Sequence, residues 1–181
     1  MQSLSRLNEM IPAWANDRLQ QVEKLEVHRR GLRHKAVSVF VTAGDHILLQ
    51  QRALSKYHTP GLWANTCCTH PRWDEAPDIC ALRRLQEELG ISGLQVNPVG
   101  QVEYRSEVGQ GLVEHEVVDV FLATARGRPV PRPDPAEVAD TCWMTVAELD
   151  AALLAKPERF TPWLRIYLTE HRARIFGARA K

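Results

Sequence analysis

Apolar and polar residues alternate in short segments over the first third of the chain, and this alternation predicts β-strands. Half-apolar segments on either side of Asn16-Asp17 indicate a hairpin over residues 10–23. Residues 36–41 and 46–51 form two further strand patterns around the turn sequence Ala43-Gly44-Asp45. We therefore expect the chain to begin with short strands joined by tight turns.

Another strand pattern lies in the second half of the chain. Residues 112–125 are rich in Val and Phe and follow the turn sequence Gly109-Gln110-Gly111. Because such a turn reverses the chain, we expect this strand to pair back onto residues 99–107. Residues 126–137 contain four prolines, which rule out regular structure, and we expect a surface loop there.

Helical periodicity is clearest over residues 77–90. Ile79, Leu82, Leu85 and Leu89 recur there at three- and four-residue spacings, and the pattern ends in Gly. This pattern predicts a half-buried helix with a C-terminal glycine stop.

Two more helices are predicted from their first residues. Thr145 and Glu148 form a capping box for a helix that continues through Leu154, and Thr161-Pro162 begins another. Strands and helices in this mixture predict an α/β fold, with helices packed on a mixed β-sheet.

Length, charge and cysteine content narrow the class of protein. We expect one domain over residues 1–181, with loosely ordered tails at 1–9 and 175–181. Lys and Arg number 23 against 22 Asp and Glu, so no strong basic charge recruits nucleic acid. No apolar run approaches the ~20 residues that cross a bilayer, and the first ten residues lack the apolar centre of a secretory signal, so we expect a cytoplasmic protein. The four cysteines lack the spacing of a disulfide scaffold or a zinc ribbon, which favours free thiols.

The segment NTCCTHP at residues 65–71 brings a thiol and an imidazole together. In an extended segment Cys68 and His70 point to one side, and Cys67 points to the other. Cys68 is therefore the thiol that shares a site with His70. The remaining cysteines fit the usual role of a buried thiol as a small apolar residue.

Two groups of charged residues are candidates for a cation site. On the helix, Arg84, Glu87 and Glu88 share the face opposite the leucines, although such charged faces are usually only solvated. On the strand, Glu114 and Glu116 share one face, where two carboxylates are costly to bury without a cation. An exposed strand end would remove that cost, so both interpretations stay open from these residues alone.

The residues around the helix resemble the Nudix box, whose pattern is Gly, Glu, Arg, Glu, Glu, Gly and an aliphatic residue. The corresponding positions are Thr69, Glu75, Arg83, Glu87, Glu88, Gly90 and Ile91. Thr69 replaces the leading glycine, and Arg84 replaces the remaining glutamate of the box. Two positions that a diphosphate-hydrolysing Nudix enzyme needs are thus altered.

Further segments between residues 24 and 163 resemble the type I isopentenyl-diphosphate isomerase family, a branch of the Nudix superfamily. They include KLEVH at 24–28, QQRALSK at 50–56, PGLWANTCCTHP at 60–71, VEHEV at 113–117 and FTPWL at 160–164. The resemblance implies a Nudix-like α/β/α sandwich around a mixed sheet. It also implies an enzyme that interconverts isopentenyl and dimethylallyl diphosphate for isoprenoid biosynthesis, carotenoids included.

The same resemblance implies metal and substrate contacts. One divalent ion, Mn²⁺, Mg²⁺ or Zn²⁺, would be bound by His28, His34, His70, Glu114 and Glu116. A second ion, Mg²⁺, would be held by Glu88 against the substrate diphosphate. The phosphate oxygens would be contacted by Lys24, Arg52, Lys56 and Arg84.

The resemblance further implies how the protons move. Cys68 and Glu116 would form an acid and base pair on opposite faces of the substrate and exchange roles between the two directions. Tyr104 would hydrogen-bond Glu116, and Trp163 would offer its ring to the cationic intermediate.

Two other functions stay open at this point. A nucleoside-diphosphate hydrolase is favoured by the Glu87-Glu88 pair and disfavoured by Arg84. A metal-storage protein or thiol redox sensor built on His70 and Cys67-Cys68 would leave Trp163 without a role. For the isomerase we expect a small-molecule substrate, no nucleic acid or membrane partner, and a monomer or weak dimer.

Overall fold

The central strand of the structure is β3, which contacts four other strands. The structure is a computed structural model and describes residues 9–177. In chain order its elements are β1 (Met10–Ala15), β2 (Arg18–Glu23), α1 (Lys24–Arg30), β3 (His34–Ala43), β4 (His46–Arg52), β5 (Trp63–Ala64), β6 (Cys67–Thr69), α2 (Pro77–Leu89), β7 (Asn97–Glu107), β8 (Val113–Thr124), β9 (Val138–Thr145), α3 (Val146–Ala155), the 3-10 turn η2 (Pro157–Arg159), α4 (Pro162–Glu170) and α5 (Arg172–Phe176).

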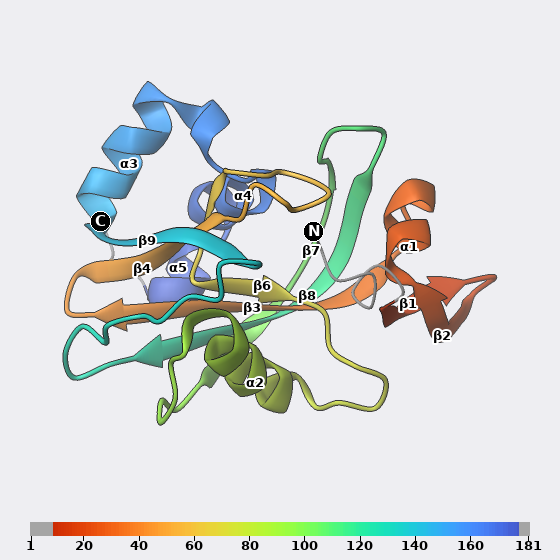
Figure 1. Cartoon of the computed structure of the whole chain (residues 1–181), viewed down its shortest axis with the longest axis horizontal. Helices are drawn as coiled ribbons and strands as arrows, with labels where there is room; N and C mark the ends of the chain where they lie inside the picture. Colours follow the sequence, from red (N-terminus) through yellow and green to blue (C-terminus); the bar gives the residue numbers. More distant parts are fainter. Residues whose placement is uncertain (1–8, 178–181) are drawn as a thin grey trace.

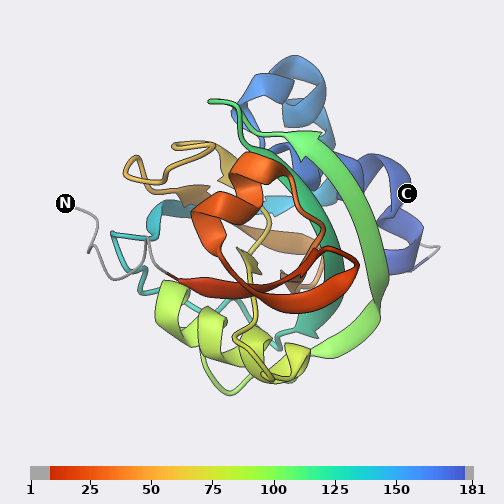
Figure 2. The same cartoon turned by 90° about the vertical axis from the view of Figure 1, so that its right-hand side faces the viewer.

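These strands form one mixed sheet. β3 pairs in parallel with β8 and antiparallel with β1, β4 and β6. β7 extends the sheet beyond β8, and β9 pairs with β4. The β1–β2 hairpin and α1 lie together at one end of the sheet (Figures 1 and 2).

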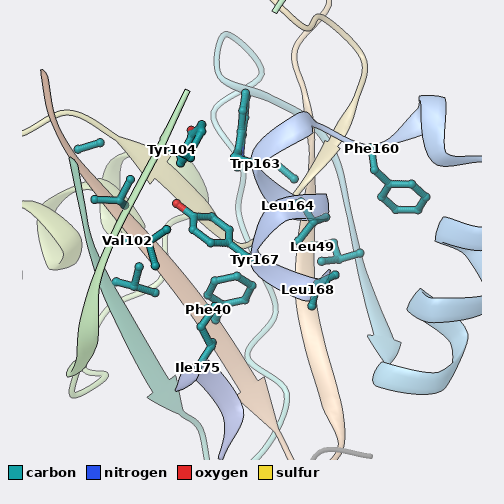
Figure 3. Packing of buried hydrophobic residues seen from close by; sticks show 14 of the residues in the cluster. Phe40, Leu49, Val102, Tyr104, Phe160, Trp163, Leu164, Tyr167, Leu168 and Ile175 are labelled. Carbon is teal, nitrogen blue, oxygen red and sulfur yellow. The ribbon is translucent and has the colours of Figure 1, made fainter. Parts of the chain in front are cut away.

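Helices cover both faces of the sheet (Figure 1). On one face, Leu85 and Leu89 of α2 join a buried cluster with residues of β3 and β8. On the other face, α3, α4 and α5 bury a second cluster (Figure 3), in which Phe40 meets the ring of Tyr167 edge-on at 5.6 Å. The predicted α/β arrangement of helices around a mixed sheet is confirmed.

Most predicted elements form where the patterns placed them. Asn16 and Asp17 adopt the positive φ angles of 52° and 60° that a two-residue hairpin turn requires. β7 and β8 pair antiparallel, and Thr145 forms the capping box with Glu148 at the start of α3. In the described part of the chain, no helix is long and apolar enough to span a bilayer.

The helix α2 is rotated relative to its predicted apolar face. It ends at Gly90, whose φ of 64° makes the expected stop. Ile79, however, is 54% exposed, and small Cys80 and Ala81 pack against the sheet in its place. The same rotation buries Glu88, which the pattern had placed on a face opposite the leucines.

Two further expectations need correction. Ile175 and Phe176 were assigned to a loosely ordered tail, but they lie in α5, and Ile175 is buried because it belongs to the core beneath α4. Residues 1–8 and 178–181 of the expected tails lie outside the described residues. The loop at 126–137 has no helix or strand, as predicted, but its last residue, Glu137, is buried.

Candidate active site

Strand register gathers the predicted metal ligands. The parallel pairing of β3 with β8 sets His34 opposite Glu116. Glu114 lies two residues before Glu116 on β8, so its side chain is on the same face of the sheet. His70 comes directly after β6, which pairs with β3. His28 lies on α1, a helix for which the sequence analysis had no signal, and which is capped by the Glu23 side chain.

Four of these residues could hold one ion. Single ligand atoms of His28, His34, His70 and Glu114 all lie within 4.8 Å of one another, and all four residues are buried. Glu116 adjoins the group, because its Oε1 lies 3.2 Å from Nε2 of His70.

The donor chemistry of this group fits a divalent cation. Nδ1 of His28 and Nδ1 of His34 face the backbone oxygens of Lys24 and Leu32 at 2.5 and 2.8 Å, which leaves each Nε2 free to ligate. Nε2 of His34 faces Oε2 of Glu114 at 3.2 Å, and Nε2 of His70 faces Oε1 of Glu116 at 3.2 Å. Neither these two ring nitrogens, nor Nδ1 of His70, nor Oε2 of Glu114 reaches hydrogen-bond geometry within the described residues, and all four atoms are buried. Buried polar atoms rarely stay unsatisfied, and a cation would satisfy the ligating ones.

His34 and His70 differ in the direction of their pKa shifts. Burial alone would lower the pKa of His34, but its contacts with Glu114 and Glu116 outweigh burial and raise the pKa to about 10. Burial lowers the pKa of His70 to about 4. The carboxyl of Glu114 has its pKa held below the ordinary value, because the surrounding imidazoles outweigh the effect of burial. A positive charge at this point is therefore strongly favoured.

Cys68 and Cys67 lie on opposite faces of β6, as predicted. Cys67 is fully buried in the cluster beneath α2, whereas Cys68 lines a pocket on the other face. The Cys68 thiol donates to Oδ1 of Asn65 at 2.8 Å and lies 3.3 Å from Oγ of Ser38. Burial raises the pKa of the Cys68 thiol to about 12, so the thiol is neutral at physiological pH.

Two aromatic residues, Tyr104 and Trp163, also line this pocket. Tyr104 and Trp163 lie at the same end of the core cluster (Figure 3). The hydroxyl of Tyr104 donates to Oε2 of Glu116 at 2.5 Å, as the sequence analysis expected. Trp163 has the guanidinium carbon of Arg52 at 5.3 Å from its ring centroid.

The four predicted phosphate contacts line the same pocket. Its lining residues are Lys24, Arg52, Lys56, Tyr57, His58, Cys68, Thr69, His70, Arg84, Tyr104, Glu114, Glu116 and Trp163. The remaining predicted residues, His28, His34 and Glu88, are buried and are not among these lining residues. Glu88 accepts from Arg84 at 2.6 Å and from Gln50 at 3.2 Å.

Sequence reasoning missed several side chains of the site. Tyr57 and His58 lie in the loop between β4 and β5, where neither periodicity nor a motif marks them. Glu137 forms ion pairs with Lys56 and Arg84. Its position could not be predicted because it depends on long-range backbone hydrogen bonds that tie the proline-rich loop to α2 and to the end of β4.

Comparison with known proteins defines the family. The protein-family model described as NUDIX domain matches residues 32–164 of this chain. The crystal structure of a MutT Nudix hydrolase from Burkholderia pseudomallei is similar with a TM-score of 0.60 and 24% identity, covering 77% of this chain and 98% of that one. A Deinococcus radiodurans protein gives a TM-score of 0.64 at 15% identity, with 81% and 90% covered. These likenesses show the Nudix fold.

Relatives in sequence are much closer. The isopentenyl-diphosphate Delta-isomerase of Rhodobacter capsulatus is 62% identical over 168 residues, which cover 93% of this chain and 96% of the relative. The protein of the same name from Cereibacter sphaeroides is 62% identical over 169 residues, with the same coverage. The chain belongs to the isopentenyl-diphosphate Delta-isomerase family.

In this isomerase-family chain, side chains of the altered Nudix box form a network of ion pairs. Arg83 donates to both oxygens of Glu75, at 2.6 and 2.7 Å. Arg84, which replaces a glutamate of the box, donates to Glu87 and Glu88 and lies 3.3 Å from Glu137. The substitution puts a cation among three carboxylates, at the edge of the pocket.

Proposed function

We propose that this chain interconverts isopentenyl diphosphate and dimethylallyl diphosphate, in the synthesis of isoprenoid precursors. The observation that carries the proposal is that Cys68 and Glu116, a neutral thiol and a carboxylate, line one pocket with a group of basic side chains. A proton donor and acceptor suit the alkene end of such a substrate, and Arg and Lys side chains suit its diphosphate end.

The reaction needs one proton added and another removed. Protonation of the terminal alkene carbon C4 of isopentenyl diphosphate moves the π electrons into the new C–H bond and leaves a tertiary cation at C3. Loss of a proton from C2 returns the electron pair to form the C2–C3 double bond. The phosphorus–oxygen and carbon–oxygen bonds stay intact throughout.

Cys68 and Glu116 act as the acid and base pair in this proposal. The pair holds one proton in total, and burial favours its residence on the thiol in the substrate-free chain. In the direction that forms dimethylallyl diphosphate, the Cys68 thiol gives its proton to C4 and Glu116 takes a different proton from C2. After product release Glu116 loses its proton to solvent and the thiol regains one from solvent. The two residues exchange roles in the reverse direction. The hydrogen bond from the Tyr104 hydroxyl orients the carboxylate of Glu116.

The remaining pocket residues bind and orient the substrate. Trp163 faces the cationic carbon, an interaction worth ~2 kcal/mol or more when desolvated, and its ring already attracts Arg52. The phosphate oxygens are contacted by Lys24, Arg52, Lys56 and Arg84. The rings of Tyr104 and Trp163 help to exclude water that would trap the cation.

Two ions complete the proposed site. One divalent ion, Mn²⁺, Mg²⁺ or Zn²⁺, would be held by His28, His34, His70, Glu114 and Glu116, and Mg²⁺ would be held by Glu88 near the diphosphate. When bound, these cations supply positive charge that fixes Glu116 and neutralises the phosphates. We further propose a single cytoplasmic domain that acts as a monomer or weak dimer.

A product assay tests this function. Metal-loaded protein is incubated with isopentenyl diphosphate and Mg²⁺, and dimethylallyl diphosphate is resolved from released phosphate. We expect dimethylallyl diphosphate to form without phosphate. Phosphate release would identify a hydrolase, and the absence of both products would favour a metal-storage or redox protein.

A further inference from the structure

His58 lines the pocket but has no part in the chemistry proposed above. It is buried in the loop between β4 and β5. Its ring stacks on His28 with centroids 5.5 Å apart, and meets Trp163 edge-on at 6.1 Å. The imidazole of His58 therefore lies between His28, a candidate metal ligand, and Trp163, a candidate substrate contact.

The carboxylate of Glu114 divides its two oxygens between different partners. Oε2 lies 3.1 Å from Nε2 of His28 and 3.2 Å from Nε2 of His34, inside the group that could hold an ion. Oε1 lies 3.1 Å from Nε2 of His58. His58 is not among the four residues whose ligand atoms converge, and its contact is with the oxygen other than the one that lies near His28 and His34.

The surroundings of His58 favour a donor at Nε2. Nδ1 lies 3.1 Å from Oγ1 of Thr59, and a hydroxyl that donates to Nδ1 leaves the ring proton on Nε2. Thr59 has a φ of 45°, which is rare for a β-branched residue. Such strain persists where the surrounding structure holds it, and it clusters at functional sites.

We propose that His58 is a positioning residue whose Nε2–H donates to Oε1 of Glu114 and so presents Oε2 to the divalent ion. This inference rests on the proposed metal site. Mutation of a residue that orients a metal ligand by a hydrogen bond typically weakens metal affinity by about 10–100-fold. The effect of His58 on turnover should therefore pass through occupancy of the ion site.

The backbone of His58 supports a separate function. Its carbonyl oxygen accepts from Nη2 of Arg52 at 3.1 Å, close to the proposed phosphate site. A side-chain substitution leaves this carbonyl in place. The KM for isopentenyl diphosphate at saturating metal should therefore stay near the wild-type value.

Three substitutions separate a hydrogen-bond role from a packing role. His58→Gln carries an amide N–H near the position of Nε2, whereas the amide of His58→Asn reaches only the position of Nδ1. His58→Phe keeps a ring but has no donor. The matched control is His46→Phe, which alters a histidine that pairs with Asp45 outside the pocket.

The experiment measures the dissociation constant for Mn²⁺ alone, by competition with a chelator, in each full-length variant. We expect about 10–100-fold weaker binding in His58→Asn and His58→Phe, and binding by His58→Gln and His46→Phe close to wild type. Excess Mn²⁺ should restore turnover in the weak variants. Thermal unfolding with chelator present reports whether each variant is folded. Either His58→Asn or His58→Phe, which both lack a donor at the Nε2 position, can carry the test.

Three outcomes would overturn the inference. They are unchanged affinity in both His58→Asn and His58→Phe, an equal loss in His58→Gln and His58→Asn, and turnover that excess Mn²⁺ does not restore. Failure of the metal site itself gives a different result, because the wild type and His34→Asn would then bind Mn²⁺ equally weakly.

Discussion

Tyr104 donates a hydrogen bond to Oε2 of Glu116 at 2.5 Å, across a pair of antiparallel strands whose register sets the two residues opposite each other. The other oxygen of Glu116 lies 3.2 Å from Nε2 of His70. The carboxylate is thus held on both sides, and its position is fixed before any substrate enters.

Removing the Tyr104 hydroxyl should therefore slow the proposed proton transfer. A hydrogen bond to a charged group contributes about 1.5–3 kcal/mol, so we expect Tyr104→Phe to lower kcat by about 10–100-fold. The hydroxyl contacts neither the ion nor the diphosphate in this account, so bound metal and KM should change little. Steady-state kinetics and metal analysis measure both. A wild-type kcat in this variant would mean that Tyr104 only packs the core.

Metal uptake should depend on pH through His34. The pKa of His34 is raised to about 10 in the metal-free chain, so the ring is protonated at neutral pH and an ion must displace that proton. As pH falls below this pKa, the proton competes more strongly, and the apparent affinity contributed by this residue should drop about tenfold per pH unit.

Chelator competition between pH 6 and 9 measures this slope. His34→Asn should bind metal more weakly and with a shallower slope, while the control His46→Asn should match the wild type. Proton uptake on metal binding, or a pH-independent affinity in the wild type, would contradict the proposed ligand.

Substitutions of the basic residues should act mainly on substrate binding. Contacts to a diphosphate that does not react exist in both ground and transition states, so Lys56→Ala should raise KM by about tenfold or more with a smaller change in kcat. Arg84→Ala should also raise KM and in addition lower the melting temperature, because it removes the cation that pairs with both buried carboxylates, Glu88 and Glu137. Exposed Arg165→Ala serves as the control. Unchanged KM in both variants would place the phosphate contacts elsewhere.

The fold could be predicted where local patterns decide it. The turn at Asn16-Asp17 and the capping box of Thr145 are properties of neighbouring residues, and both form as expected. The face of α2 could not be predicted, because tertiary packing prefers small Cys80 at the sheet over the more apolar Ile79. Helix α1 was missed because it spans only seven residues.

The site shows the same division. Alternation along a strand was enough to place Glu114 with Glu116, and Cys68 apart from Cys67. His58 and Glu137 come from loops, whose paths depend on contacts with distant segments. No periodicity marks such residues, so only the three-dimensional structure brings them to the pocket.

Isotope exchange with solvent tests the central claim that Cys68 and Glu116 transfer protons while the diphosphate only anchors the substrate. In deuterated water the wild type should place deuterium in dimethylallyl diphosphate and, through reversal, in recovered isopentenyl diphosphate, without releasing phosphate. Cys68→Ala should abolish this exchange and still bind metal, whereas Cys67→Ala, which alters the opposite face of β6, should retain it. Full deuterium exchange in Cys68→Ala, or loss of exchange in Cys67→Ala alone, would contradict the account.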